Sequence, residues 1–157
     1  MSAKPKSRTW DMKTQLGVGA KGEKLLLKHW PHPVHKHPVF KGPDFIDIQD
    51  TVIELKTDTY DMDKTPNFFI ERWSNAEKKH PGGPWQAHLK GVEVFVYLFI
   101  THKKWFIFRD MPALLARLDQ LTEKAYVHNI PNKGWITQGY RVKRADLQDL
   151  YTEEDLV

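Results

Sequence analysis

The stretch from Gly42 to Lys56, GPDFIDIQDTVIELK, constrains the fold more than any other part of the chain. It contains two short apolar segments, FIDI and TVIEL, on either side of Gln49 and Asp50, which is the pattern of a β-hairpin. Strand side chains alternate between faces, so Glu54 and Lys56 project from the same side. Strands favour β-branched and aromatic residues, so this charge pair indicates either a solvated outer face or a functional site.

The position of Asp44 relative to Glu54 depends on the loop of this hairpin. With a two-residue turn at Gln49-Asp50, Asp44 would stand opposite Leu55 and point away from the face that carries Glu54. A loop with an odd number of residues, or a bulge near Asp44, brings Asp44, Glu54 and Lys56 onto one face. If the two carboxylates act together, we therefore predict such an irregularity.

Composition limits the class of protein. A chain of 157 residues with 40% hydrophobic content can bury one ordinary core, so we expect residues 1–157 to form a single domain. The absence of cysteine excludes disulfides and thiolate zinc sites, and it favours a reducing, cytoplasmic location. The longest apolar run, Val94–Ile100, is too short to span a membrane. Residues 1–12 lack the apolar core of a signal peptide and are interpreted as a basic arm.

Charge is distributed unevenly along the chain. Residues 43–77 carry nine acids and three bases, whereas residues 78–144 carry four acids and twelve bases. Residues 1–42 are also basic, and residues 145–157 form an acidic C-terminal segment. Basic segments attract a polyanion such as DNA through counterion release, and a divalent metal would offset the repulsion from the acidic part. Solvated charged faces are the alternative interpretation.

Periodicity and helix-boundary residues predict the remaining elements. Residues 17–22 read GVGAKG, but no strand precedes them, so a loop and a helix start are expected instead of a dinucleotide site. Residues 29–38, with four histidines and three prolines, are expected to form a surface loop. The predicted elements are helices at 23–30, at 84–91, from Asp110 and, short and acidic, from Ala145, and strands at 67–74, 92–100, 104–109 and 135–143.

Pro43-Asp44, followed by Glu54-x-Lys56 with Glu54 at the tenth position after Asp44, resembles the core signature of the PD-(D/E)xK nuclease superfamily. The order of predicted elements over roughly residues 20–120 is also similar to that of Holliday junction resolvases and phage repair nucleases. The resemblance implies an α/β fold with a restriction-endonuclease-like core, in which helices flank a central mixed β-sheet. It further implies a Mg²⁺-dependent or Mn²⁺-dependent phosphodiesterase, a DNA endonuclease that acts on branched DNA, and a homodimer.

The resemblance also implies roles for individual residues. Asp44, Glu54 and the Leu55 carbonyl would bind the metal, and Lys56 would activate water or stabilise transition-state charge. Glu23 on the first helix and Glu71 beside Glu54 on the neighbouring strand are candidates for further acids of the metal shell. For Glu23 the alternative is a first-turn glutamate favoured by the helix dipole, and for Glu71 it is an ion pair with a nearby base.

Several bases are candidates for contacts with DNA. The resemblance places Lys90 near the scissile phosphate, and the mixture of aromatics and bases near the C-terminus is typical of surfaces that bind phosphates and stack on bases. The candidate nucleic-acid-binding residues are Lys36, Lys90, Arg141, Lys143 and Arg144. Two alternatives stay open: a non-catalytic DNA-binding module on the same fold, and an exonuclease or RNase that uses the same site.

Overall fold

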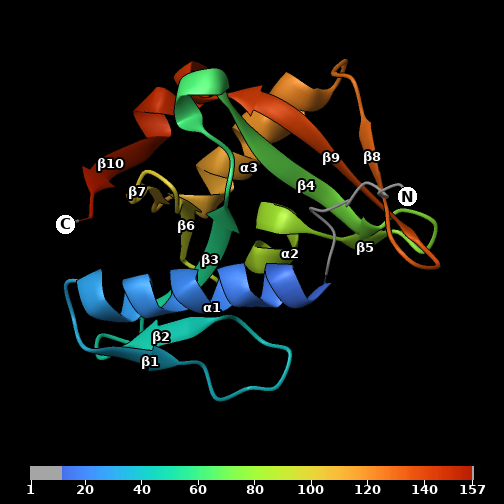
Figure 1. The fold of residues 1–157 in the computed structure, drawn as a ribbon. Helices are drawn as coiled ribbons and strands as arrows, with labels where there is room; N and C mark the ends of the chain where they lie inside the picture. The colour runs from blue at the N-terminus through green and yellow to red at the C-terminus, as the bar shows by residue number, and fades with distance from the viewer. Residues whose placement is uncertain (1–11, 157) are drawn as a thin grey trace, which may run out of the picture.

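The computed structural model describes residues 12–156, which form two β-sheets with three α-helices (Figure 1). The larger sheet has six strands in the order β1-β2-β3-β6-β7-β10, and the smaller has four in the order β5-β4-β9-β8. The elements, in chain order, are α1 (Met12–His29), β1 (Val34–Lys36), β2 (Phe45–Asp47), β3 (Val52–Asp58), the 3-10 helix η2 (Met62–Lys64), β4 (Asn67–Asn75), β5 (His80–Pro81), α2 (Gly83–Leu89), β6 (Val94–Phe99), β7 (Lys104–Phe108), α3 (Met111–Thr122), β8 (His128–Pro131), β9 (Ile136–Lys143), the 3-10 helix η3 (Arg144–Leu150) and β10 (Tyr151–Asp155).

The six-stranded sheet is mixed, as predicted, because β3 and β6 run parallel while its other neighbours are antiparallel. Every residue of β6 is buried, since alternate side chains enter two apolar clusters on opposite faces. Val96 packs with Leu26 of α1 on one face, and Tyr97 packs with Phe68 of β4 on the other. The predicted strand at residues 92–100 is confirmed, and its burial on both faces is that of a central strand in an α/β sheet.

The hairpin of β2 and β3 has the irregularity that the sequence predicted. Phe45 pairs with Ile53 and Ile46 with Val52, and the Asp47 N–H donates to the Thr51 carbonyl at 3.0 Å. The loop therefore contains three residues, 48–50, and the last, Asp50, has φ 63°, the left-handed conformation typical of three-residue hairpin loops. This register puts Asp44 opposite Glu54.

The prediction that residues 67–74 join the same sheet as the hairpin is wrong. β4 pairs with β5 and β9 in the second sheet, and it packs on the first sheet through side chains. The Phe68 ring lies 4.8 Å from the Tyr97 ring, and the Phe69 N–H donates to the Tyr97 hydroxyl at 3.0 Å, while that hydroxyl donates to the buried Asp58 carboxylate. This polar link fixes the second sheet against β3 and β6.

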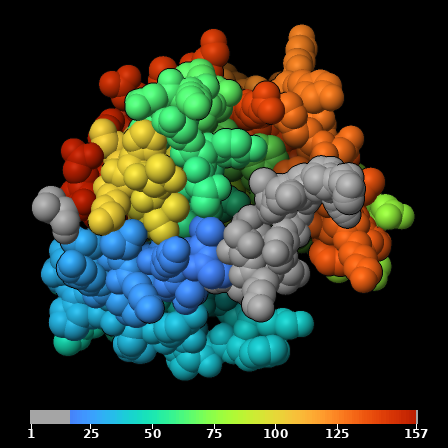
Figure 2. Space-filling model, viewed as in Figure 1, coloured from blue at the N-terminus to red at the C-terminus, as the bar shows by residue number. Residues whose placement is uncertain are grey.

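α1 is longer than predicted, because it runs through the glycines at 17–22 instead of starting after them. It lies across the front of the molecule above β1 and β2 (Figures 1 and 2), and it buries Leu26 and Trp30 against the sheet. Gly22 is required at its contact with β3, because a Cβ there would lie 2.1 Å from Thr57 Oγ1. Within residues 12–156, no helix is both long and apolar enough to cross a membrane.

The Gly22 contact leads to a stability prediction. Gly22→Ala is expected to lower the free energy of unfolding by about 1–3 kcal/mol, because the added methyl group forces α1 away from Thr57. Gly19→Ala is the matched control: a Cβ at Gly19 meets nothing within 4 Å, so alanine should raise stability by up to about 1 kcal/mol through helix propensity. Denaturant unfolding compares the two variants, and equal stabilisation by both would contradict the close contact.

Four short strands escaped prediction, one of them the two-residue β5, which pairs with β4. β1 lies inside the histidine-proline segment that was expected to be a loop, and it pairs with β2. β8 pairs with β9, and β10 in the acidic C-terminal segment pairs with β7. These are edge or hairpin strands whose side chains are mostly exposed, so they carry no apolar alternation to reveal them. The predicted helix from Ala145 is the 3-10 helix η3, and residues 1–11 of the predicted basic arm lie outside the described residues.

Candidate active site

Asp44 immediately precedes β2, and Glu54 lies in β3. The register of β2 and β3 places them opposite each other, and both side chains are half-buried. Asp44 Oδ2 accepts a hydrogen bond of 2.8 Å from the Leu55 backbone N–H, which holds this carboxylate against β3. The backbone of Leu55 therefore lies at the carboxylate pair, and ligation by its carbonyl stays a prediction.

Burial and neighbouring charges perturb both carboxyl groups of this pair. Burial, followed by the charge of Asp44, raises the pKa of Glu54 to about 7. Burial also raises the pKa of Asp44, and the Glu23 carboxylate adds to this effect. Glu54 Oε1 is buried and has no hydrogen-bond partner among the described residues. An unpartnered carboxylate oxygen beside a second carboxylate fits a hard divalent ion such as Mg²⁺ or Mn²⁺, which prefers oxygen ligands.

Lys56 projects from the same face of β3 as Glu54 and lines the same pocket, a cavity of about 140 Å³. The second wall comes from β4 and the start of α2. The lining residues are Glu54, Leu55, Lys56, Phe69, Ile70, Glu71, Gly83, Pro84, Gln86 and Phe95. The pocket thus lies between the two sheets, with a carboxylate and an ammonium on one wall and a further carboxylate on the other.

Glu71 reaches this pocket by a different route from the one predicted. It does not lie on a strand next to β3, because β4 belongs to the second sheet. Burial raises the pKa of Glu71, and the Lys56 ammonium opposes that shift. Two glycines make room for the Glu71 side chain and backbone: a Cβ on Gly82 would lie 2.1 Å from Glu71 Oε2, and one on Gly83, whose φ is +49°, would lie 2.4 Å from the Glu71 carbonyl oxygen. The glycine pair before Pro84 is a sequence signal of this close approach, because small residues are needed where side chain or backbone comes this near.

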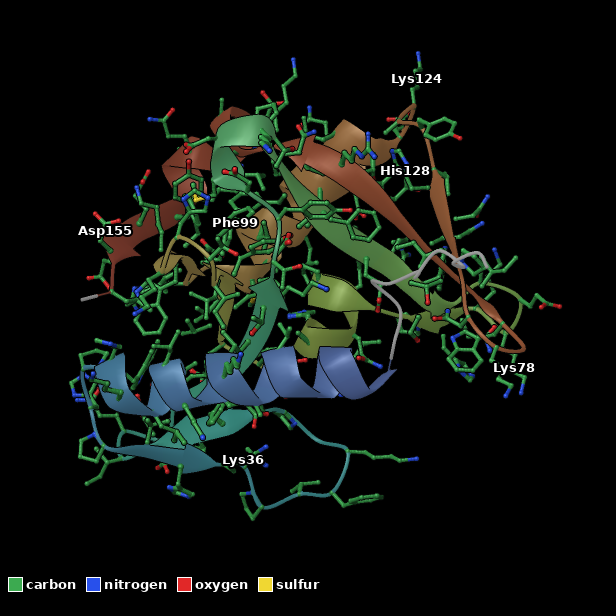
Figure 3. All side chains as sticks on the ribbon, viewed as in Figure 1. Lys36, Lys78, Phe99, Lys124, His128 and Asp155 are labelled. Atoms are coloured by element: carbon green, nitrogen blue, oxygen red, sulfur yellow. The ribbon has the colours of Figure 1, made fainter. Side chains whose placement is uncertain are left out.

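Glu23 and Lys36 lie at the edge of the site. Lys36 projects from β1 toward α1 (Figure 3) and forms an ion pair of 3.0 Å with Glu23. The charge of Glu23 raises the pKa of Asp44 and that of Lys36 lowers it, so both residues lie within electrostatic reach of the carboxylate pair. The extension of α1 and the addition of β1 to the sheet, neither of which was predicted, bring them there.

Lys90 is the residue that caps the C-terminus of α2. Its charge lowers the pKa of both Asp44 and Glu54. Gln86, one turn earlier on α2, lines the pocket. Gln86 and Lys90 are four residues apart and share one side of α2, and this side lies near the pocket and its acids.

The three C-terminal candidates for DNA contacts differ in their surroundings. Arg141 and Lys143 are exposed on alternate positions of β9. Arg144 is half-buried, and its guanidinium donates to the carbonyls of Asn67 at 3.1 Å and Met62 at 3.3 Å. Arg144 therefore fastens η2 and the start of β4 to η3, and its role as a nucleic-acid-binding residue stays a prediction.

A second group of potential ligands lies outside the pocket. Asp61, Asp63 and His102 place ligand atoms within 4.8 Å of one another. Asp61 Oδ1 accepts from the Asp63 N–H at 2.9 Å and contacts His102 Nε2 at 2.9 Å. The arrangement is accounted for as the N-terminal cap of η2, so we place no metal there.

In comparisons with known proteins, no family model and no curated protein matches the chain.

Proposed function

We propose that this protein is a divalent-metal-dependent nuclease with a restriction-endonuclease-like core, of the PD-(D/E)xK type. One observation carries the proposal: the three-residue hairpin loop puts Asp44 opposite Glu54, where Glu54 Oε1 is buried without a partner among residues 12–156. Lys56, two residues along the same strand face, lines the same pocket. A divalent ion held by such carboxylates can activate water and offset charge on the phosphoryl group in phosphodiester hydrolysis.

Each charged residue in and around the pocket has its own proposed role. Asp44, Glu54 and the Leu55 carbonyl would bind Mg²⁺ or Mn²⁺, with Glu23 and Glu71 as outer acids. When bound, the ion supplies positive charge against a phosphate oxygen and lowers the pKa of water. We assign to Lys56 the donation of N–H groups to the attacking water or to the phosphoryl oxygens, and the charges of Lys56 and Glu71 interact across the pocket. Lys90 lies beside the same acids and contacts the scissile phosphate.

DNA is the proposed substrate. Lys36 lies beside Asp44, and the exposed Arg141 and Lys143 extend the positive surface along β9, so a polyanion gains counterion release on both sides of the pocket. We propose endonuclease action on branched DNA, with a homodimer presenting two pockets to two strands. A non-catalytic DNA-binding module would keep the basic surface and lose the need for the carboxylate pair.

The first experiment is a nicking assay with and without metal. Purified protein is incubated with supercoiled, linear, branched and single-stranded DNA and with RNA, in Mg²⁺, Mn²⁺ or EDTA. We expect metal-dependent nicks in supercoiled and branched DNA and none in EDTA. Binding without nicks in any metal would support the non-catalytic alternative, and degradation of only linear ends or only RNA would change the substrate class.

Asp44→Asn is expected to weaken metal binding by at least about 100-fold, because removing a ligand costs at least as much as removing a group that supports one. Isothermal titration with Mn²⁺ measures the affinity. Asp50→Asn is the matched control, since Asp50 is exposed on the hairpin loop and asparagine tolerates its left-handed backbone. Equal affinities for the two variants would contradict the assignment of Asp44.

A further inference from the structure

One face of the second sheet continues from the catalytic pocket to the molecular surface. Residues opposite each other in antiparallel strands share a face, and Glu71 pairs with Gly139, which in turn pairs with His128. Two residues away on β4, Phe69 pairs with Arg141. We call this face, formed by Asn67, Phe69, Glu71, His128, Gly139, Arg141 and Lys143, the outer face. The opposite face, with Phe68, Ile70 and Val142, is buried in the core.

The outer face carries a line of aromatic rings that begins in the pocket. Phe69 lines the pocket and lies over Gly139, where a Cβ would be 2.5 Å from Phe69 Cζ. The Phe69 ring meets the ring of His128 with centroids 6.5 Å apart, and His128 meets Tyr126 at 4.7 Å. His128 lies on β8, at the far side of β9 from β4 (Figure 3). Tyr126 is 76% exposed, so its ring offers a free surface that the fold does not use.

Positive charge runs beside these rings. Arg141 and Lys143 are exposed and stand opposite Phe69 and Asn67. Glu71 is the one acid among the residues of the outer face, and it lies in the pocket. The alternation of rings for bases with cations for phosphates is the arrangement of surfaces that bind single-stranded nucleic acid.

We propose that the outer face binds unpaired nucleotides of a single-stranded arm, stacking bases on His128 and Tyr126 while Arg141 and Lys143 contact the phosphates. The inference rests on the proposed nuclease function and narrows its substrate class to DNA with a single-stranded segment beside the cleaved bond. A duplex fits the rings poorly, because its bases are already stacked on each other and present only their edges in the grooves. Phe69 links the stacking surface to the pocket, so the scissile phosphate lies next to the unpaired bases.

Fluorescence anisotropy in EDTA, with a labelled oligothymidylate and a labelled blunt duplex as probes, tests the proposal without cleavage. Tyr126→Ala is expected to weaken oligothymidylate binding by about 5- to 100-fold, the contribution of one stacked base, and to leave duplex binding nearly unchanged. Tyr60→Ala is the matched control, because Tyr60 is 65% exposed and lies away from the outer face. Arg141→Gln should lower oligothymidylate affinity and reduce its salt dependence.

Unchanged oligothymidylate binding by Tyr126→Ala, or an equal loss for duplex and oligothymidylate, would overturn the proposal. Circular dichroism and thermal unfolding check that each variant is folded. The two proposals fail separately. If Tyr126→Ala selectively loses single-strand binding and the unmodified protein nicks no substrate, the outer-face proposal is supported and the nuclease proposal is contradicted. If the unmodified protein nicks DNA with metal and Tyr126→Ala shows no selective loss, the nuclease proposal is supported and the outer-face proposal is contradicted.

Discussion

Lys56→Ala is expected to lower metal-dependent cleavage by at least about 100-fold, the scale of a group that assists proton transfer or stabilises charge in the transition state. Lys56 lies on the strand face that carries Glu54 and lines the pocket, where its charge acts on Glu71. A single ammonium contributes little to the total affinity for DNA, which depends on many phosphate contacts. Binding measured by anisotropy in Ca²⁺ should therefore change by no more than about twofold.

Lys64→Ala is the control for this variant, because Lys64 is an exposed lysine on η2 outside the pocket. It should cleave at the rate of the unmodified protein. Full activity of Lys56→Ala would contradict the role of Lys56. A parallel loss of DNA affinity would instead identify Lys56 as a binding residue.

Glu54→Gln is expected to remove metal binding and at the same time to stabilise the metal-free protein at pH 8. The pKa of Glu54 is about 7 in the folded protein, raised first by burial, and it returns to its ordinary, lower value when the chain unfolds. The folded state therefore favours the protonated form. The contribution of Glu54 to the free energy of unfolding is greatest below its pKa in the unfolded chain, and it is lost as pH rises through about 7. The full loss is about 3 kcal/mol, from 1.36 kcal/mol for each pH unit of the difference.

Glutamine does not ionise, so the free energy of unfolding of the Glu54→Gln variant should decrease much less as pH rises. Denaturant unfolding in EDTA at several values between pH 5 and pH 8 measures it, and Glu77→Gln, at an exposed loop position, is the control that should keep the decline. For the unmodified protein, the affinity for Mn²⁺ should increase about tenfold for each unit by which pH is raised up to 7, because the ion must displace a proton. Above pH 7 the affinity should stay constant. A stability that is independent of pH in the unmodified protein would contradict the buried carboxylate.

Local chemistry allowed several parts of the fold and site to be predicted. The continuous apolar run Val94–Ile100 lies in a predicted strand, and a run of this kind is typical of a strand buried on both faces, as β6 is. Asp110 and Pro112 predicted the start of α3, where Asp110 Oδ1 accepts from the Ala113 N–H at 3.0 Å. The alternation of side chains along the two strands also predicted the odd-membered loop that puts Asp44 opposite Glu54. Each of these depends on residues that are close in the sequence.

Contacts between distant residues decided the rest. The alternation of side chains from Phe68 to Glu71 is the same whether β4 extends the first sheet or packs on it. The contact of Phe68 with Tyr97 belongs to the packed arrangement, and it joins residues that are distant in the sequence. α1 continues through its glycines because Gly22 fits against Thr57, which no helix propensity reveals. Arg144 binds carbonyls of Met62 and Asn67, far from it in the chain.

The sequence alone therefore determined the hairpin, its two acids and its lysine, because the spacing of side chains along a strand is set by the backbone. Tertiary structure alone decided that Glu71 faces Lys56 across a pocket, that Glu23 reaches Asp44, and that Phe69, His128 and Arg141 share one face. Those neighbours come from separate strands and helices, and which backbone groups pair is set by packing over the whole molecule.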